Sequence, residues 1–370
     1  MSIPFTDHVS GLPATVPFVG PEAQERARGR PFRARLGANE SAFGPAPEAI
    51  DAMSRAARET WQYGDPEMHD LLAALAGHAG VSPQNIAIGE GIDGLMGTAL
   101  RLLLEPGRAA VTSLGAYPTF NFHVAGVGAQ LMTVPYRDDR QDWALLAEAA
   151  RIAQASVVYL ANPDNPTGSM LRAGDITRFL DALPARCVLF IDEAYGEFAP
   201  AGALPGIDPD DPRVIRLRTF SKAHGLAGLR VGYALCAPEM ARAFDKLRNH
   251  FGMGRIAQAG ALGALSAPGW LTEVIARTAR AQERIGQIAR ENGLTALPSA
   301  TNFVALDCGG DGAVARAVLE ALAARDVFVR MPGAAPIDRC IRVTAGRDEA
   351  LDVFAAALPE ALAEARGIAA

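Results

Sequence analysis

The chain has 370 residues, more than a single hydrophobic core usually holds, so the sequence predicts a large domain and a smaller one. Hydrophobic residues make up 49% and charged residues 21%, which is typical of a globular protein and excludes a fibre or a disordered tail. A formal net charge of −6 and the lack of a dense Lys/Arg run argue against nucleic acid or an anionic membrane as a partner, which leaves a small-molecule role.

The four cysteines are scattered, and neither they nor the six histidines show the spacing of a metal site. We therefore expect reduced thiols and no metal. The first 21 residues lack a basic region followed by an apolar stretch, and no run approaches the roughly 20 apolar residues of a membrane span. These observations lead us to expect a cytoplasmic protein.

Seven short apolar runs, separated by stretches with helical periodicity, follow a Pro/Gly-rich lead. They are residues 85–89, 109–113, 130–135, 156–162, 187–194, 214–220 and 231–236. Brief apolar strands that alternate with helices predict an α/β domain in which helices cover both faces of a mainly parallel seven-stranded sheet. Ligands of such sheets bind beyond the C-terminal ends of the strands.

Beyond about residue 240, long helical stretches lead into a second set of strands at residues 302–308, 327–331 and 340–346. This pattern predicts a smaller α+β domain. We expect an N-terminal arm over residues 1–38 that belongs to the small domain, a large domain over 39–240 and the rest of the small domain over 241–370.

Polar side chains follow three of the predicted strands. Asn165 lies in the turn "NPDNPTG", Asp192 and Tyr195 lie in "DEAY", and Lys222 follows the next strand in "RTFSK". Each has a structural explanation when taken alone, as a turn residue, a helix cap or a surface lysine. An ionised Asp at the end of an apolar strand is costly unless it meets a cation, so the polar residues at the three strand ends together indicate a binding site.

One cofactor requires these groups together. Pyridoxal 5′-phosphate needs a lysine for a Schiff base, a carboxylate for its pyridine nitrogen and donors for its phenolic oxygen. Lys222, Asp192, and the pair Asn165 and Tyr195 suit these roles. The groups suited to its phosphate are the side chains of Thr219, Ser221 and Arg230 and the backbone of the glycine-rich turn at Gly91, Ile92 and Asp93. That turn, "GEGIDG", does not complete a dinucleotide-binding fingerprint, which disfavours a dehydrogenase.

The sequence resembles a fold-type I pyridoxal-phosphate aminotransferase of class I/II, and within that group the histidinol-phosphate aminotransferase family. The resemblance spans roughly residues 15–355. It is carried, in chain order, by "LGANESAFGP" (36–45), "YGDPEMHDLLAALA" (63–76), "NPDNPTG" (162–168), "DEAY" (192–195), "FSKAHGLAGLRVG" (220–232) and "IRVTAG" (341–346).

The resemblance implies further roles. Lys222 would form the Schiff base and shuttle the proton, and Tyr117 would stack on the cofactor ring. Tyr63 would reach the phosphate from the neighbouring subunit, so that a homodimer shares its active sites. Arg342 would bind the carboxylate of an amino acid or 2-oxo acid, and Asn39 would lie close to the same place.

Two positions bear on the substrate. Phe18 stands where the family usually has a tyrosine that helps to hold a substrate phosphate, and Arg330 is retained but lies beside "MPGAAP". Because a second phosphate needs several charged donors, we expect an unphosphorylated, aromatic or apolar amino acid as the donor and a 2-oxo acid as the acceptor. Histidinol phosphate is the alternative substrate. Decarboxylation of a phosphorylated amino acid is a second alternative reaction.

Overall fold

The large sheet of the computed structural model, which describes residues 3–14 and 19–367, has seven strands in the order β2-β8-β7-β6-β5-β3-β4. The strands are β2 (Ile86–Gly89), β3 (Ala109–Ser113), β4 (Gln130–Val134), β5 (Val157–Ala161), β6 (Val188–Asp192), β7 (Val214–Thr219) and β8 (Gly232–Cys236). The sequence prediction of these seven strands is confirmed within two residues at each end. Only β8 runs antiparallel to its neighbours β2 and β7, and the other pairings in this sheet are parallel.

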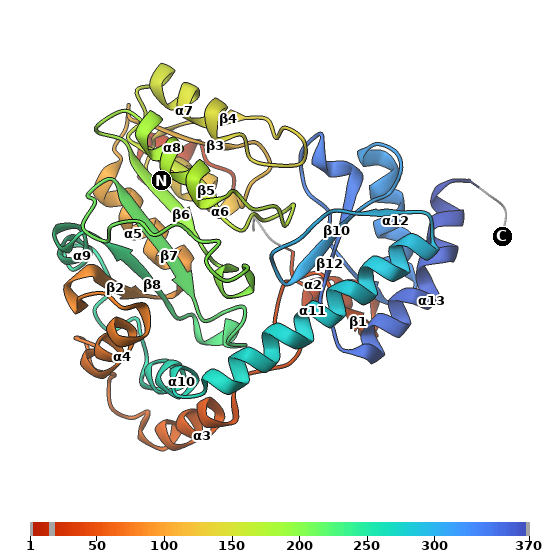
Figure 1. Ribbon diagram of the computed structural model, residues 1–370, viewed down its shortest axis with the longest axis horizontal. Coiled ribbons are helices and arrows are strands. Elements are labelled where there is room, and N and C mark those ends of the chain that lie inside the picture. The colour runs from red at the N-terminus through yellow and green to blue at the C-terminus, as the bar shows by residue number, and fades with distance from the viewer. Residues whose placement is uncertain (1–2, 15–18, 368–370) are drawn as a thin grey trace.

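Helices cover both faces of this sheet, as Figure 1 shows. One face packs against α5 (Gly91–Leu103), α6 (Pro118–Gly126) and α9 (Pro238–Phe244), and the other against α7 (Trp143–Ile152) and α8 (Ala173–Ala182). Side chains alternate along each strand, so Tyr159 joins the first cluster while Val158 and Leu160 join the second. Burial on both faces explains why the strands are continuous apolar runs.

A third apolar cluster continues the large domain at the β2 edge of the sheet. It joins α3 (Pro47–Ala56), α4 (His69–Ala79) and α10 (Arg255–Leu265) to β2 and β8. Small residues allow the close approach, because a Cβ added at Gly263 would lie 2.7 Å from the backbone of Ala49.

The small domain has its own core. A sheet in the order β12-β10-β9, formed by β9 (Thr295–Ala296), β10 (Phe303–Asp307) and β12 (Cys340–Thr344), packs with α11 (Pro268–Glu291), α12 (Gly312–Ala324) and α13 (Asp348–Ala365). The pair β1 (Ala34–Arg35) and β11 (Val327–Phe328) adds the N-terminal arm to this core. The arm also contains α1 (Asp7–Ser10) and α2 (Pro21–Arg28).

The packing of α10 and α11 leads us to propose a boundary between the two units later than residue 240. Helix α10 packs on α3 and α4 of the large domain, although the sequence assigned it to the small one. Helix α11 belongs to both units, because Trp270 packs against the large-domain cluster and Ile285 lies in the small-domain core. We therefore propose a boundary within α11. The sequence did not indicate this boundary, because helical periodicity alone does not reveal which core an amphipathic helix covers.

All four cysteines are free and buried. Between residues 3 and 14 and between 19 and 367, no helix has the length and apolar character needed to cross a membrane.

Candidate active site

A cavity of about 670 Å³ lies at the C-terminal ends of the parallel strands and is lined by both domains. Most of the predicted site residues line it. These are Asn39, Ile92, Asp93, Tyr117, Asn165, Asp192, Tyr195, Thr219, Ser221, Lys222, Arg230, Arg330 and Arg342. The structure therefore brings together residues that are up to about 300 positions apart in the sequence.

Lys222 enters the cavity from the segment that follows β7. Its Nζ lies 5.7 Å from the centroid of the Tyr195 ring. Burial, reinforced by the positive charge of Arg342, lowers the pKa of Lys222 to about 8. The amine is therefore far more often neutral near physiological pH than an ordinary lysine, which is what a nucleophilic amine requires.

Asp192 is held at the end of β6 by two hydrogen bonds. The hydroxyl of Tyr159 donates to Oδ2 at 2.6 Å and the backbone N–H of Ala194 donates to Oδ1 at 2.9 Å. The side chain is buried, and burial raises the pKa of Asp192 to about 6 although both hydrogen bonds oppose the rise. A buried carboxylate of this kind favours a cationic ligand group.

Tyr195 is fixed by a chain of hydrogen bonds that crosses between the domains. Asn39 Nδ2 donates to the Tyr195 hydroxyl at 2.9 Å, and Thr344 Oγ1 of β12 donates to Asn39 Oδ1 at 3.0 Å. Asn39 is 2% exposed and adopts a φ of 54°, so the loop that carries it is tightly determined. The chain ties the large-domain tyrosine to the small-domain sheet.

Arg342 occupies the wall opposite the large domain. Its guanidinium donates to Asn165 Oδ1 and to the carbonyl oxygen of Gly37, and it lies 5.2 Å from the centroid of the Phe303 ring. Its Nε is buried and lacks a partner among the described residues. Burial lowers the pKa of Arg342 to about 10. A guanidinium with an unused buried N–H is suited to bind a carboxylate.

An anion cradle forms where the antiparallel β8 returns beside the start of α5. Arg230 Nη1 lies 3.3 Å from Ser221 Oγ, and Thr219 Oγ1 lies 2.9 Å from the same atom. Gly91 opens α5 with a φ of +73°, and a Cβ added there would lie 2.4 Å from Arg230 Nη2. Free N–H groups of the first helical turn, together with an arginine, are suited to bind an anion such as phosphate.

Tyr117 and Asp93 complete this side of the cavity. The Tyr117 hydroxyl donates to Asp93 Oδ2 at 3.3 Å, and Arg230 Nη2 lies 3.8 Å from the same oxygen. Burial and the neighbouring Asp93 charge raise the pKa of Tyr117, so the phenol stays neutral. The contacts hold the Tyr117 ring over the cavity.

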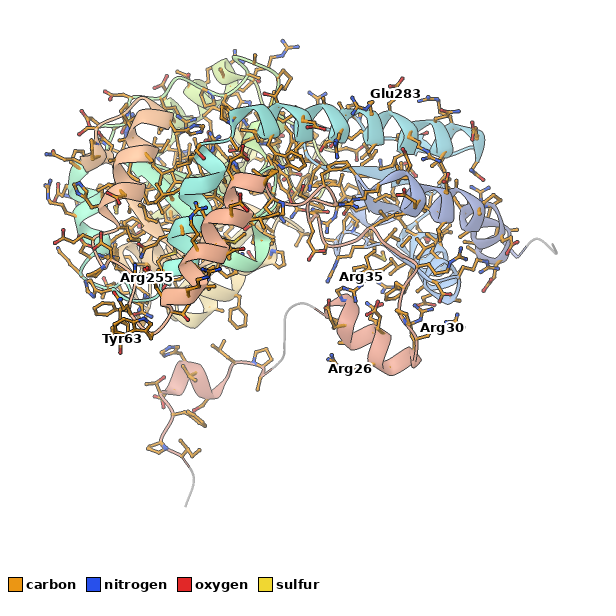
Figure 2. The ribbon with its side chains drawn as sticks, turned by 90° about the horizontal axis from the view of Figure 1, so that it is seen from below. Arg26, Arg30, Arg35, Tyr63, Arg255 and Glu283 are labelled. Carbon is orange, nitrogen blue, oxygen red and sulfur yellow. The ribbon has the colours of Figure 1, made fainter. Side chains whose placement is uncertain are left out.

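One described residue, Tyr63, lies away from the cavity. Tyr63 is 79% exposed on the outer surface beside Arg255, as Figure 2 shows, and its ring packs on Phe251 with centroids 4.9 Å apart. It does not line the cavity of its own chain. Phe18 lies outside the described residues. The next residue, Val19, accepts a 2.7 Å hydrogen bond from Arg330, which itself lines the cavity.

Sequence reasoning missed Tyr159 and Thr344. Tyr159 lies in the middle of an apolar strand, where an aromatic residue indicates core packing. The register of the two parallel strands relates Tyr159 to Asp192. Ala161 pairs with Asp192, so Tyr159, two residues before Ala161, lies on the same face of the sheet as Asp192. Thr344 belongs to the motif "IRVTAG", but its contact with Asn39 depends on the packing of the two domains.

Comparison with known proteins identifies the family. Residues 34–358 match the family Aminotransferase class I and II. The chain belongs to this family. It is 34% identical over 337 residues to histidinol-phosphate aminotransferase 2 of Methylococcus capsulatus, which covers 89% of this chain and 90% of the relative. An aromatic amino acid aminotransferase of Thermobifida fusca is 36% identical over 281 residues, 75% of this chain and 78% of that one.

A solved structure is more similar still. The histidinol-phosphate aminotransferase from Sinorhizobium meliloti, in complex with pyridoxal 5′-phosphate, has 54% sequence identity and a TM-score of 0.94, over 98% of both chains. Within the class I and II aminotransferases, this protein therefore belongs to the histidinol-phosphate aminotransferase family. The sequence predictions of an aminotransferase and of its fold type are confirmed.

Proposed function

We propose that the protein is a pyridoxal-phosphate-dependent aminotransferase that transfers the amino group of histidinol phosphate to a 2-oxo acid. The observation that carries this proposal is the pairing of two arginines at the cavity wall. The N–H of Arg342 donates to the carbonyl oxygen of Arg330 at 2.6 Å, and both residues line the cavity. Because both residues line one cavity, one arginine is available for a carboxylate and the other for a phosphate monoester.

This proposal reverses the order of substrates drawn from the sequence, which placed an aromatic or apolar amino acid first. From the sequence, Arg330 was the one arginine expected near a second phosphate. In the structure, a backbone bridge pairs Arg330 with Arg342. The relatives with the names and identities given above also support histidinol phosphate. The aromatic amino acid remains the alternative, supported by the Thermobifida fusca relative.

The residues of the cavity fit pyridoxal 5′-phosphate. Lys222 offers an amine with a lowered pKa, Asp192 offers a buried carboxylate for a ring nitrogen, and Tyr195 offers a hydroxyl for the phenolic oxygen. The cradle at Gly91, Ser221 and Arg230 would hold the phosphate. The close approach of the Arg230 guanidinium to the backbone of Gly91 supports this assignment, because a Cβ at Gly91 would meet that guanidinium.

The bound cofactor supplies an electron sink that stabilises negative charge on the carbon bearing the substrate's amino group. Lys222 Nζ would take the proton from that carbon and pass it to the C4′ carbon of the cofactor, and in the second half of the reaction it would move a proton in the opposite direction, to the carbon of the 2-oxo acid. Asp192 would hold a proton on the ring nitrogen, and Tyr159 would keep that carboxylate ionised. Arg342 would bind the carboxylate of the 2-oxo acid, and Arg330 the phosphate of the amino donor.

A homodimer is part of the proposal. Trp61, Tyr63 and Phe251 are 82%, 79% and 54% exposed, although residues of this kind usually pack against other apolar groups. We infer that a second copy covers them, and that Tyr63 reaches the cradle of that copy. Mixing inactive Lys222→Ala with inactive Tyr63→Ala tests this, because each mixed dimer has one site with both wild-type residues. Activity that does not recover on mixing would contradict a shared site.

The substrate is tested with kcat/KM for histidinol phosphate, histidinol and phenylalanine, with 2-oxoglutarate as acceptor. We expect the highest value for histidinol phosphate. Replacement Arg330→Gln should lower that value by at least about tenfold and change the value for phenylalanine little. A higher kcat/KM for phenylalanine would support the aromatic alternative. Release of carbon dioxide from an added phosphorylated amino acid, with no 2-oxo acid present, would support a decarboxylase.

A further inference from the structure

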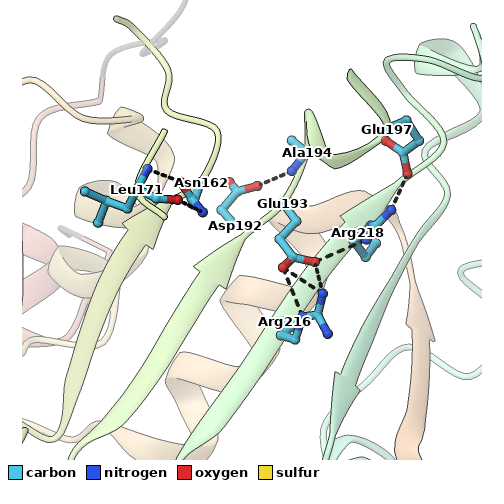
Figure 3. A network of polar contacts seen from close by, with 8 residues as sticks. All are labelled: Asn162, Leu171, Asp192, Glu193, Ala194, Glu197, Arg216 and Arg218. Carbon is cyan, nitrogen blue, oxygen red and sulfur yellow. Dashed lines mark hydrogen bonds and ion pairs between the residues drawn. The ribbon is translucent and has the colours of Figure 1, made fainter. Parts of the chain in front are cut away.

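Four charged side chains form an ion cluster near Asp192, where β6 and β7 end (Figure 3). Glu193 accepts two hydrogen bonds from Arg216, at 3.0 and 3.1 Å, and one from Arg218 Nη1 at 3.3 Å. Arg218 Nη2 donates to Glu197 Oε1 at 2.7 Å. The Glu193 side chain is fully buried, and those of Glu197 and Arg218 are 7% and 14% exposed. No step of the reaction described above uses these groups.

Arg218 links the two strands beyond the end of their backbone pairing. The ladder between β6 and β7 ends at Asp192 and Leu217, followed by a 2.9 Å bond from the Glu193 N–H to the Leu217 carbonyl oxygen. Past this bond the β6 side turns into η3 (Gly196–Phe198), while the β7 side continues toward Lys222. The Arg218 guanidinium contacts carboxylates at both ends of that turn.

The cluster is electrically balanced, with two carboxylates and two guanidinium groups. Burial alone would raise the pKa of Glu197, but the Arg218 charge outweighs it and the pKa lies below its ordinary value. Glu197 Oε2 and Arg218 Nε are nevertheless buried without partners among the described residues. A buried ion pair of this kind stabilises a fold less than apolar packing would, but it can hold the segments that carry its two partners in one arrangement.

We propose that Arg218 is a positioning residue, which through Glu197 holds the turn after β6 at a fixed place relative to Lys222. Tyr195 lies in that turn and Asp192 directly precedes it, so both would contact the cofactor at a distance from Lys222 that the cluster sets. The inference concerns the binding of pyridoxal phosphate and holds for any amino donor.

The chain offers a matched control. Arg216 lies on the same strand and the same face as Arg218 and also pairs with Glu193, but it lies within the backbone ladder, opposite Ile191 and Leu235. Each arginine is replaced by lysine, which keeps the charge and loses the fork that binds two oxygens. The dissociation constant of pyridoxal phosphate is measured by titrating cofactor-free protein, and kcat, KM and the free energy of unfolding are measured alongside.

We expect Arg218→Lys to raise the cofactor dissociation constant and to lower kcat by about tenfold each, with KM for the donor within twofold, because the arginines at the opposite wall are unchanged. Arg216→Lys should leave these constants within about twofold even where it lowers stability equally. Glu197→Gln should reproduce the effect of Arg218→Lys, and the double variant should be no worse than the worse single one.

Equal effects of the two arginine replacements on cofactor binding and kcat would overturn the proposal and leave the cluster as a stabilising feature only. If Arg218→Lys does not fold, Glu197→Gln carries the same comparison, because it retains the shape of the side chain. A wild-type protein that binds no pyridoxal phosphate would instead refute the proposed function, so the two failures are distinguishable.

Discussion

The hydroxyl of Tyr159 lies 2.6 Å from Oδ2 of Asp192, within the apolar cluster that fills one face of the large sheet. The two residues come from the adjacent parallel strands β5 and β6, and the register of those strands sets them on one face. A hydrogen bond to a charged acceptor in a buried place is worth about 1.5–3 kcal/mol. It therefore offsets part of the cost of keeping the Asp192 carboxylate ionised.

Replacement Tyr159→Phe removes this hydrogen bond and keeps the ring. Because the bond lowers the pKa of Asp192, its loss should raise that pKa above about 6. We expect kcat/KM to fall by about tenfold and the acid limb of its pH profile to move to higher pH. Tyr136→Phe is the control, since it removes a comparable 3.0 Å bond to buried Asp164. An unmoved acid limb in Tyr159→Phe would contradict the role of this hydroxyl.

Lys222 and Lys246 are the only lysines of the chain, so amine reactivity can be assigned to each. In cofactor-free protein, acetylation of Lys222 should rise with pH around a midpoint near 8, since the amine is protonated and unreactive below that pKa. The Arg342 charge lowers this pKa and the Asp192 charge raises it. Arg342→Gln should therefore raise the midpoint and Asp192→Asn should lower it. Mass spectrometry of the acetylated peptide, with exposed Lys246 as internal reference, checks both signs; a wild-type midpoint near 10 would contradict the prediction.

The sequence predicted those parts of the site that local chain chemistry determines. Strand ends with turn residues place Asn165, Asp192 and Lys222 at one edge of a parallel sheet, and any such sheet would bring them together. The roles proposed for Tyr117 and Arg342 came only from the resemblance to a family. Periodicity does not show that Tyr117 caps a helix beside Asp93, or that Arg342 crosses from the small domain.

Contacts between distant segments could not be predicted from the sequence. The link from Thr344 through Asn39 to Tyr195 joins three elements that lie up to 305 positions apart. The assignment of α10 to the large domain likewise depends on small residues such as Gly263 meeting α3, and the sequence does not say which helix a small residue will face.

Gly91→Ala is expected to weaken cofactor binding more than it weakens the fold. A residue with a side chain at a φ of +73° costs about 1 kcal/mol, and the new Cβ would lie 2.4 Å from Arg230 Nη2, the far end of a flexible side chain that can move away. The moved guanidinium would then leave the phosphate site. Gly107→Ala is the control, because its φ is +92° and nothing lies within 4 Å of the added Cβ. Titration with pyridoxal phosphate should show a raised dissociation constant for Gly91→Ala alone, and equal constants for both variants would count against the cradle.

Asp164 gives the protein a pH-dependent stability that a neutral residue would remove. The carboxylate is 1% exposed and accepts hydrogen bonds from Tyr136 and Thr167, yet burial raises its pKa from 3.8 to about 6. The folded state therefore binds this proton more tightly than the unfolded state does. The contribution of Asp164 to stability falls as pH rises from 3.8 to about 6, by about 1.4 kcal/mol per pH unit at most.

Asp164→Asn stays neutral, so its free energy of unfolding should increase relative to that of the wild type between pH 4.5 and 7.5. Urea unfolding of cofactor-free protein at both pH values measures the change, with Asp311→Asn at the exposed start of α12 as control. The sign of the change with pH is the test, because a lost hydrogen bond would lower the free energy of unfolding equally at both pH values. A difference between variant and wild type that is constant with pH would mean that Asp164 does not titrate in this range.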